Sequence, residues 1–197
     1  MNDPNPSSPA DQHHLGEHPD VRPPRRARTG RLHAVVVTVS DRSAAGLRED
    51  SSGPLAASML AAAGWDVTAA VVPDEQEAIA RSILAAVATG AGLVVTTGGT
   101  GVGPRDVTPQ ATAPLLSYQL PGIAEQVRRV GVGSLPQAML SRGVAGLCES
   151  TLVVNLAGSP GAVRDGVPVV LSVAAHVVTQ LSGADHSSSE HDGDEHP

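Results

Sequence analysis

Short runs of apolar, mostly β-branched residues recur along the middle of the chain. They are too short for typical helices and are apolar throughout, which predicts strands of a sheet that is covered on both faces. The predicted strands cover residues 33–39, 65–72, 93–97 and 152–156.

Longer segments between these strands carry apolar residues at helical spacing. The segment 52–63 is rich in Ala and Leu and is followed by Gly64, a typical helix stop. The segment 74–88 begins with three acids, which favour the positive end of a helix. Further helices are predicted over residues 108–118, 122–130 and 163–181, the last as one helix or two short ones.

Strands and helices in alternation predict parallel βαβ units. The expected fold is therefore α/β, a three-layer sandwich in which helices cover both faces of a mostly parallel sheet. Ligands bind such sheets outside the carboxyl ends of the strands, near a switch in strand order. The segments to search are the strand exits, at residues 40–53, 72–77, 97–112 and 155–161.

The third exit reads TTGGTGVGPRDVTPQAT over residues 96–112. Its glycines allow a tight turn whose N–H groups point one way, which makes an anion-binding nest. Thr108 is expected to cap a helix whose first residue is Pro109, which places a helix N-terminus beside the nest. The ligand-binding residues predicted here are Thr97, Gly98, Gly99, Thr100, Gly101 and Arg105. The alternative is a glycine turn with a structural ion pair between Arg105 and Asp106.

Two carboxylates, Asp74 in the second exit and Asp106 in the third, are expected at the same sheet edge. Two acids beside a phosphate nest are suited to share a Mg²⁺ that neutralises a triphosphate. Asp74 and Asp106 are therefore the predicted catalytic and metal-binding residues. A plain helix cap is the alternative for Asp74.

The other two exits are also polar. The first begins with Ser40 and Asp41 and suits a polar ligand, or else is a solvated loop in which Asp50 or Ser51 caps the next helix. In the fourth, Asn155 leaves the strand, Gly158 allows a turn and Ser159-Pro160 predicts a helix start. Ser40, Asp41, Asn155, Gly158 and Ser159 complete the predicted ligand-binding set, although the fourth exit is equally an ordinary beginning of a helix.

The amino-acid composition excludes several kinds of catalytic and metal site. All 13 cationic side chains are Arg, so a P-loop Lys or a Schiff-base Lys is excluded, and a single Cys excludes an internal disulfide or a Cys-rich zinc site. Acidic residues are concentrated near the C-terminus, and the central region has no basic field for nucleic acid.

The domain boundaries follow from composition. Residues 1–29 and 184–197 are predicted to be disordered tails around one domain at 30–183. No uninterrupted apolar run approaches the roughly 20 residues of a membrane span, and the N-terminus lacks the apolar segment of a signal peptide. We therefore expect a cytoplasmic protein without a membrane segment.

In chain order, the motifs VSDR, EDSSG, PDEQ, TTGGTGVGPRDVTPQAT, SRGV and NLAGSPGAV resemble the MogA/MoaB group of molybdenum-cofactor biosynthesis proteins. The resemblance implies a three-layer α/β fold, assembled as homotrimers or hexamers. It also implies Mg²⁺-dependent transfer of AMP from ATP to the terminal phosphate of molybdopterin, with release of pyrophosphate. A molybdenum-insertion enzyme is the implied partner.

The resemblance also assigns roles to residues. Asp74 and Asp106 match the acids tied to catalysis in the group, Gly98 to Gly101 match its ligand-cradling loop, and Ser159 matches its pocket lining. Gln110 replaces a common acid, while Ala157 and Gly161 replace a Pro and a Lys. The alternatives are a non-catalytic molybdopterin-binding scaffold and a nucleotide-binding or hydrolase domain of the CinA type.

Overall fold

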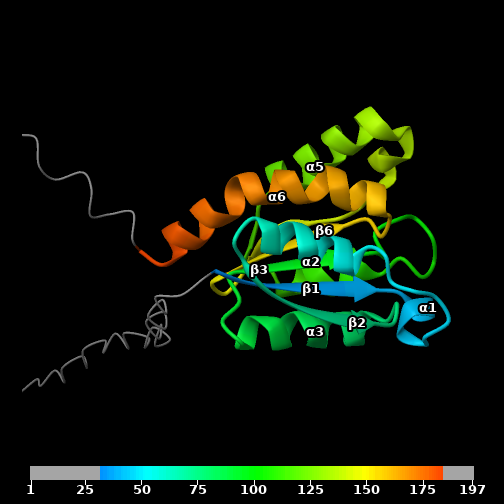
Figure 1. Cartoon of the computed structure of the whole chain (residues 1–197), viewed down its shortest axis with the longest axis horizontal. Coiled ribbons are helices and arrows are strands. Elements are labelled where there is room, and N and C mark those ends of the chain that lie inside the picture. Colours follow the sequence, from blue (N-terminus) through cyan, green and yellow to red (C-terminus); the bar gives the residue numbers. More distant parts are fainter. Residues whose placement is uncertain (1–31, 184–197) are drawn as a thin grey trace, which may run out of the picture.

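A six-stranded sheet forms the middle layer of the molecule (Figure 1). A computed structural model describes residues 32–183, so both predicted tails lie outside the described residues. The strand order is β2-β1-β3-β6-β5-β4, with β2, β1, β3 and β6 parallel and with β5 and β4 antiparallel to their neighbours. The strands are β1 (His33–Val39), β2 (Asp66–Val72), β3 (Leu93–Thr97), β4 (Tyr118–Gln119), β5 (Ala145–Cys148) and β6 (Thr151–Leu156). The predicted α/β class is confirmed.

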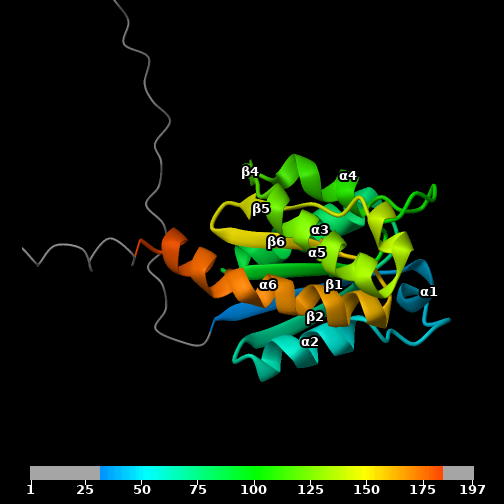
Figure 2. The same cartoon turned by 90° about the horizontal axis from the view of Figure 1, so that it is seen from above.

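Helices cover both faces of this sheet (Figures 1 and 2). On one face, α2 (Gly53–Ala62), α5 (Pro121–Ser134) and α6 (Pro160–Leu181) pack over a core that contains Leu60 and Val167. On the other face, α3 (Gln76–Ala88) and α4 (Thr108–Thr112) pack over a second core that contains Ile79 and Ile83. The result is the three-layer sandwich that the sequence predicts.

The three central strands bury side chains on both faces, as their uninterrupted apolar runs predict. In β1, Val36 points to the first core and Val37 to the second, and both are fully buried. The edge strand β2 differs, because several of its side chains are exposed. Only a strand with neighbours on both sides and helices above and below needs apolar residues throughout.

The predicted helix at residues 108–118 is wrong in its second half. Helix α4 ends at Thr112, a 3₁₀ turn η1 (Ala113–Leu115) follows, and the chain then enters strand β4. Pro114 in this turn has no N–H group to continue an α-helical ladder. The other predicted helices and strands are present, with ends shifted by up to a few residues.

The antiparallel edge was not predicted. Strands β4 and β5 are short, and β5 turns directly into β6. Glu149 in that turn has φ +53, a conformation that Gly or Asn usually supplies, so the sequence carries no turn signal there. Two other short elements, α1 (Asp41–Ala44) and η2 (Pro136–Leu140), were also missed.

Helix α6 corrects the expectation about apolar runs. It is a single helix of 22 residues with mean hydropathy 1.3, so length and composition alone would allow it to cross a membrane. Arg164 and Asp165 interrupt its apolar sequence, which is why no continuous run is visible. In the fold, Val163, Val167 and Val170 form a fully buried stripe against the sheet, whereas only 28% of the apolar window of the helix is buried.

Candidate active site at the carboxyl ends of the parallel strands

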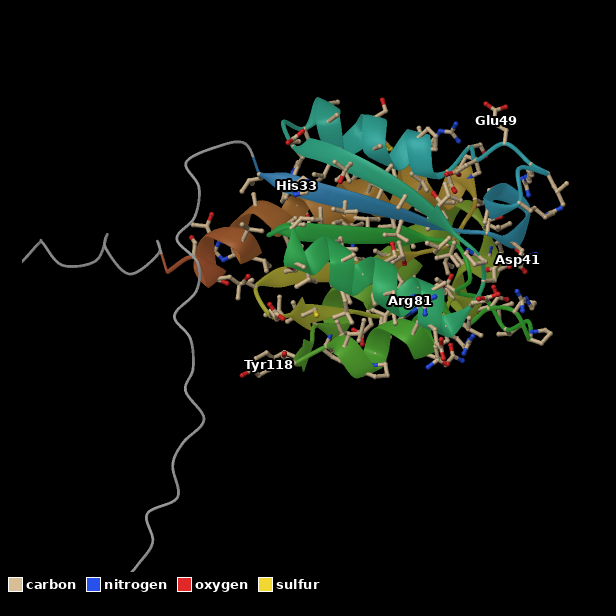
Figure 3. The ribbon with its side chains drawn as sticks, turned by 90° about the horizontal axis from the view of Figure 1, so that it is seen from below. His33, Asp41, Glu49, Arg81 and Tyr118 are labelled. Carbon is tan, nitrogen blue, oxygen red and sulfur yellow. The ribbon has the colours of Figure 1, made fainter. Side chains whose placement is uncertain are left out.

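The four predicted exits lie side by side at one edge of the sheet, because β2, β1, β3 and β6 are parallel neighbours. Backbone bonds join them: Ser40 N–H donates to Val72 O at 2.9 Å and Gly98 N–H donates to Leu156 O at 3.0 Å. The strand order reverses between β1 and β3, which is the switch point where ligands bind such sheets. Figure 3 shows Asp41 at this edge and His33 at the opposite end of β1.

The glycine loop after β3 depends on close backbone packing. Gly98 has φ +104, and a Cβ there would lie 2.3 Å from Val39 O, so β1 and the loop meet without room for a side chain. Thr108 ties down the other end of the loop: its hydroxyl donates to Gly98 O at 2.9 Å and its N–H donates to Gly99 O at 3.0 Å. Thr108 was expected to cap α4, but Val107 is the N-cap residue and Thr108 instead anchors the loop.

Asp106 folds back against this loop. Its Oδ2 accepts the Gly103 N–H at 2.9 Å, and a Cβ on Gly101 would lie 2.8 Å from the same oxygen. Arg142 braces the arrangement, because its Nε donates to Gly101 O at 2.6 Å and its Nη2 donates to Asp106 O. We did not select Arg142 from the sequence; its only signal was its place in the SRGV motif.

Asp41 and Asp74 are bonded reciprocally. Asp74 Oδ2 accepts the Asp41 N–H at 2.7 Å, and Asp41 Oδ1 accepts the Asp74 N–H at 2.9 Å. Asp74 was alternatively expected to cap the next helix, but α3 has Glu75 as its N-cap and no side-chain cap bond. The Asp74 carboxylate therefore holds the exits of β1 and β2 together.

Arg105 pairs with Asp41 and not with Asp106, so the alternative of a structural Arg105–Asp106 pair is wrong. Its Nε and Nη2 donate to Asp41 Oδ2 at 3.1 Å and 2.5 Å. This bond, followed by the one from the Asp74 N–H, lowers the pKa of Asp41. The bond with Asp41 likewise raises the pKa of Arg105, so both partners stay charged over the physiological range.

Asp50 organises the first exit in a similar way. Burial raises its pKa, but hydrogen bonds from the Thr38 hydroxyl and the N–H groups of Gly53 and Ser52 outweigh burial and lower it. The Thr38 hydroxyl donates at 2.6 Å and the two N–H groups at 3.0 Å each. Ser52 is the N-cap residue of α2 and makes no side-chain cap bond, but Asp50 accepts the N–H groups of Ser52 and Gly53 at the start of the helix. The Ser40 hydroxyl accepts from Ser43 N–H at the start of α1.

Two predicted ligand-binding residues lie beneath the loops. The Thr97 hydroxyl is buried and bonded to Ser52 Oγ at 3.2 Å. Asn155 is also buried: its Nδ2 donates to the hydroxyls of Thr96 and Thr112, and its Oδ1 accepts the Val144 N–H. These side chains support the edge from below, because all their polar atoms are already engaged inside the protein.

The remaining predicted residues lie at the surface of the loops or just under it. Thr100 is buried, and its hydroxyl accepts from Ser141 Oγ at 3.2 Å. Gly158 packs on Gly98, where a Cβ would lie 2.9 Å from the Gly98 Cα. The Ser159 hydroxyl accepts the Ala162 N–H at 3.1 Å, which confirms the predicted helix start.

Two hollows flank the contact between Gly98 and Gly158. A small polar hollow of about 80 Å³ is lined by the first exit, including Ser40, Arg48 and Asp50. A larger one of about 360 Å³ shares Gly158 with it, and the wall of this larger hollow is mostly apolar. Its lining includes the glycine loop, Asp106 and, from η2 and its flanks, Leu135, Ala138, Leu140 and Ser141. The η2 segment was not part of the predicted site.

A family model described as a probable molybdopterin binding domain matches residues 35–176. The chain belongs to this family. It is 36% identical over 156 residues to a molybdopterin adenylyltransferase of Haemophilus influenzae, covering 77% of this chain and 79% of that protein. A solved molybdopterin biosynthesis protein from Mycobacterium abscessus superposes with a TM-score of 0.74 at 48% identity, covering 78% of this chain and 98% of that one.

Some relatives in the molybdopterin-binding domain family are longer proteins. A molybdenum cofactor biosynthesis bifunctional protein of Synechococcus elongatus is 42% identical over 174 residues, which are 86% of this chain. The chain spans about half the length of that protein, 53%. The family model and these relatives thus confirm the MogA/MoaB resemblance of the motifs.

The acids of this family member are suited to Mg²⁺ only together with a substrate. Residues 32–183 contain no group of three or more His, Cys, Asp or Glu that would hold an ion alone. Each of Asp74 and Asp106 uses Oδ2 in a backbone hydrogen bond, and within the described range neither Oδ1 accepts one. One free oxygen on each of two acids fits Mg²⁺, which commonly binds through one or two carboxylates plus substrate phosphates.

Proposed function

We propose that this protein transfers AMP from ATP to the terminal phosphate of molybdopterin. An oxygen of that phosphate attacks the α-phosphorus of ATP, the bond from the α-phosphorus to the bridging oxygen breaks, and pyrophosphate leaves. The observation that carries the proposal is the convergence of two acids on the glycine loop. Asp74 Oδ1 lies 3.4 Å from the position of a Cβ on Gly99, and Asp106 Oδ2 lies 2.8 Å from that of a Cβ on Gly101.

The chemistry does not require a nucleophile from the protein, because the attacking group is already a phosphate. Catalysis of such a transfer consists of positioning the groups and stabilising the charge that develops on oxygen. The glycine loop supplies N–H groups, and Arg105 supplies a fixed positive charge beside them. The absence of Lys and the burial of the single Cys are therefore consistent with this reaction.

Asp74 and Asp106 are proposed to hold Mg²⁺ through their free Oδ1 atoms. Bound there, Mg²⁺ would supply neutralisation of the phosphate charges. The protein's part is to keep the two carboxylates fixed: the Asp41 N–H holds Asp74, and the Gly103 N–H holds Asp106.

Two substrates require two adjoining spaces, and the site has two hollows. The apolar hollow of about 360 Å³ lies within the usual range of roughly 300–1,000 Å³ for ligand pockets and suits a flat heteroaromatic ring. The polar hollow beside Arg48 and Ser40 suits a charged or hydroxylated group. Gly158, which lines both, marks their common boundary.

The wider setting is also part of the proposal. We place the protein in the cytoplasm, off the membrane and without nucleic-acid partners, as a homotrimer or hexamer that delivers its product to a molybdenum-insertion enzyme. The acidic composition argues against nucleic-acid partners, and the molybdopterin adenylyltransferase relatives support a place in molybdenum cofactor biosynthesis. The oligomeric state and the insertion enzyme are what the motif resemblance implies.

The test is a direct assay of pyrophosphate release from MgATP in the presence of molybdopterin. Wild type is expected to turn over, and Asp106→Asn, which keeps the shape but removes the charge, is expected to lose about 10³-fold in rate. The matched control is Asp66→Asn, an exposed aspartate at the amino end of β2. An unchanged rate in Asp106→Asn would contradict the role of that acid.

A non-catalytic scaffold is the competing function, and the same experiment separates the two. Tight binding of molybdopterin without pyrophosphate release in the wild type would exclude the transferase and favour the scaffold. Omitting Mg²⁺ should abolish release in the transferase, whereas it should leave the affinity of a scaffold for molybdopterin largely unchanged.

A further inference from the structure

Asp41 is the point at which three strand exits meet. Its N–H and Oδ1 bond to Asp74 after β2, and its Oδ2 accepts two hydrogen bonds from Arg105 after β3. Both carboxylate oxygens are therefore engaged by protein groups, which leaves Asp41 poorly suited to bind a ligand itself. Its place at the edge is visible in Figure 3.

The way Arg105 is held leaves part of it free. Nε and Nη2 face Asp41 Oδ2, while Nη1 makes no hydrogen bond within residues 32–183. The Arg105 side chain is 61% exposed, so the free end of the guanidinium can be reached from solvent. A guanidinium group that is bound along one edge can donate from its other edge to a phosphate while it keeps its hydrogen bonds to Asp41.

We infer that Asp41 is a positioning residue that fixes the proposed metal ligand Asp74 and the phosphate-binding edge of Arg105 at the same time. This inference rests on the proposed function and extends it, since it gives Asp41 an indirect role in place of ligand contact. An exposed ion pair contributes little to stability. The value of the Asp41–Arg105 pair therefore lies in orientation.

The substitution Asp41→Asn separates the two tasks. The Asn Oδ1 can still accept from the Asp74 N–H, and the backbone N–H at position 41 still holds Asp74. The amide nitrogen, however, is a donor and cannot accept from Arg105. Asp41→Asn should therefore release Arg105 alone, whereas Asp41→Ala removes both side-chain bonds.

The activity test is a double-mutant cycle with Arg105→Gln. We expect Asp41→Asn and Arg105→Gln each to raise the KM for MgATP about tenfold, the equivalent of one lost charge-assisted bond, and the double variant to be no worse than Arg105→Gln. Asp41→Ala should in addition lower kcat, because the Asp74 N–H loses its bond to the Asp41 carboxylate, one of the two hydrogen bonds between these residues. Asp66→Asn, with an exposed aspartate at the other end of the sheet, should match wild type.

Two results would overturn the inference. One is a further rise of about tenfold in the KM for MgATP when Asp41→Asn is added to Arg105→Gln, which would mean that Asp41 does not act through Arg105. The other is tighter MgATP binding in Asp41→Asn, which would mean that Asp41 competes with the phosphate for Arg105.

A second readout does not depend on turnover. The NMR signal of the Arg105 Nε–H should be protected from solvent exchange in the wild type and lose that protection in Asp41→Asn, whatever reaction the protein catalyses. Rapid solvent exchange of this proton in the wild type would contradict the hydrogen bond from Arg105 to Asp41. If pyrophosphate release is absent from the wild type while protection is present, the proposed function fails and the anchoring geometry survives.

Discussion

The two ends of the parallel sheet are built differently. At the amino ends, main-chain bonds dominate the turns: Asp66 N–H donates to Leu32 O at 2.8 Å, and Gly92 N–H donates to His33 O at 2.9 Å. At the carboxyl ends, carboxylates also accept backbone N–H groups: Asp41 accepts from Asp74 in the neighbouring exit, whereas Asp50 and Asp106 accept from N–H groups within their own exits. Main-chain bonds join neighbouring strands at both ends of the sheet, and only the carboxyl ends add carboxylates that line the edge with fixed charge.

Glycines show the same difference. Gly90, at the amino end of β3, has φ +81, and nothing lies within 4 Å of the position of its Cβ. Gly98, at the carboxyl end of the same strand, has φ +104, and its Cβ position is 2.3 Å from Val39 O. The first glycine serves backbone conformation only, whereas the second also permits the close packing that shapes the site.

Gly98→Ala is expected to have the largest effect on stability, and Gly90→Ala is its matched comparison. Gly98→Ala should lower the free energy of unfolding by about 3 kcal/mol or more, because a backbone clash is added to the unfavourable φ. Gly90→Ala should cost only about 1 kcal/mol. Urea denaturation of both variants measures the difference, and equal losses would contradict the distinction between the two ends.

Buried side-chain bonds give the next comparison. Asn155→Leu removes the three bonds of a fully engaged amide at the carboxyl end and leaves the Val144 N–H unsatisfied, which should cost about 2 kcal/mol. Thr151→Val at the amino end removes one bond, to Ala91 O at 2.7 Å, and should cost about 1 kcal/mol. Thermal unfolding monitored by circular dichroism ranks the two variants, and the reverse order would show that the Asn155 network is not structural.

The lowered pKa of Asp50 predicts that its contribution to folding stability changes with pH only under acidic conditions. Its pKa is lower in the folded protein than in the unfolded chain, where an Asp has a pKa of about 3.9. The ionised Asp50 therefore stabilises the fold fully above about pH 5, and this contribution is lost as the pH falls through the folded pKa.

The measurement for Asp50 is the stability of Asp50→Asn relative to wild type between pH 7 and pH 3. The variant should be less stable by about 1 kcal/mol at pH 7, since it weakens a helix cap, and the difference should shrink below about pH 4. A difference that stays constant over this range would show that the charge of Asp50 does not contribute.

The smallest expected effect concerns Gly161, where the related proteins that the motifs resemble carry Lys. Only Ser159 Oγ, at 3.9 Å, lies near the position of a Cβ there, so a longer side chain fits. Gly161→Lys should tighten MgATP binding about threefold through one added surface charge. Gly161→Met controls for the added stem, and calorimetry measures both; equal affinities would show that position 161 lies outside the phosphate site.

Local patterns identified most of the fold. The apolar runs of β1, β3 and β6 and the helical spacing of α3 required no tertiary information, because burial on two faces or on one stripe leaves its period in the sequence. The β5–β6 hairpin left none, since Glu149 occupies a turn conformation that its residue type does not favour. Strand β4, with two residues, is too short to show any period.

For the site, the sequence determined which loops would carry the chemistry, because parallel strands place their exits at one edge. It also selected Asp74, Asp106 and the glycines by residue type. Only the tertiary structure decided that Arg105 pairs with Asp41, that Asn155 is enclosed, and that Arg142 braces the loop. Hydrogen-bond partners separated by dozens of residues are chosen by how the loops pack, and a linear pattern of residue types does not encode distances across that packing.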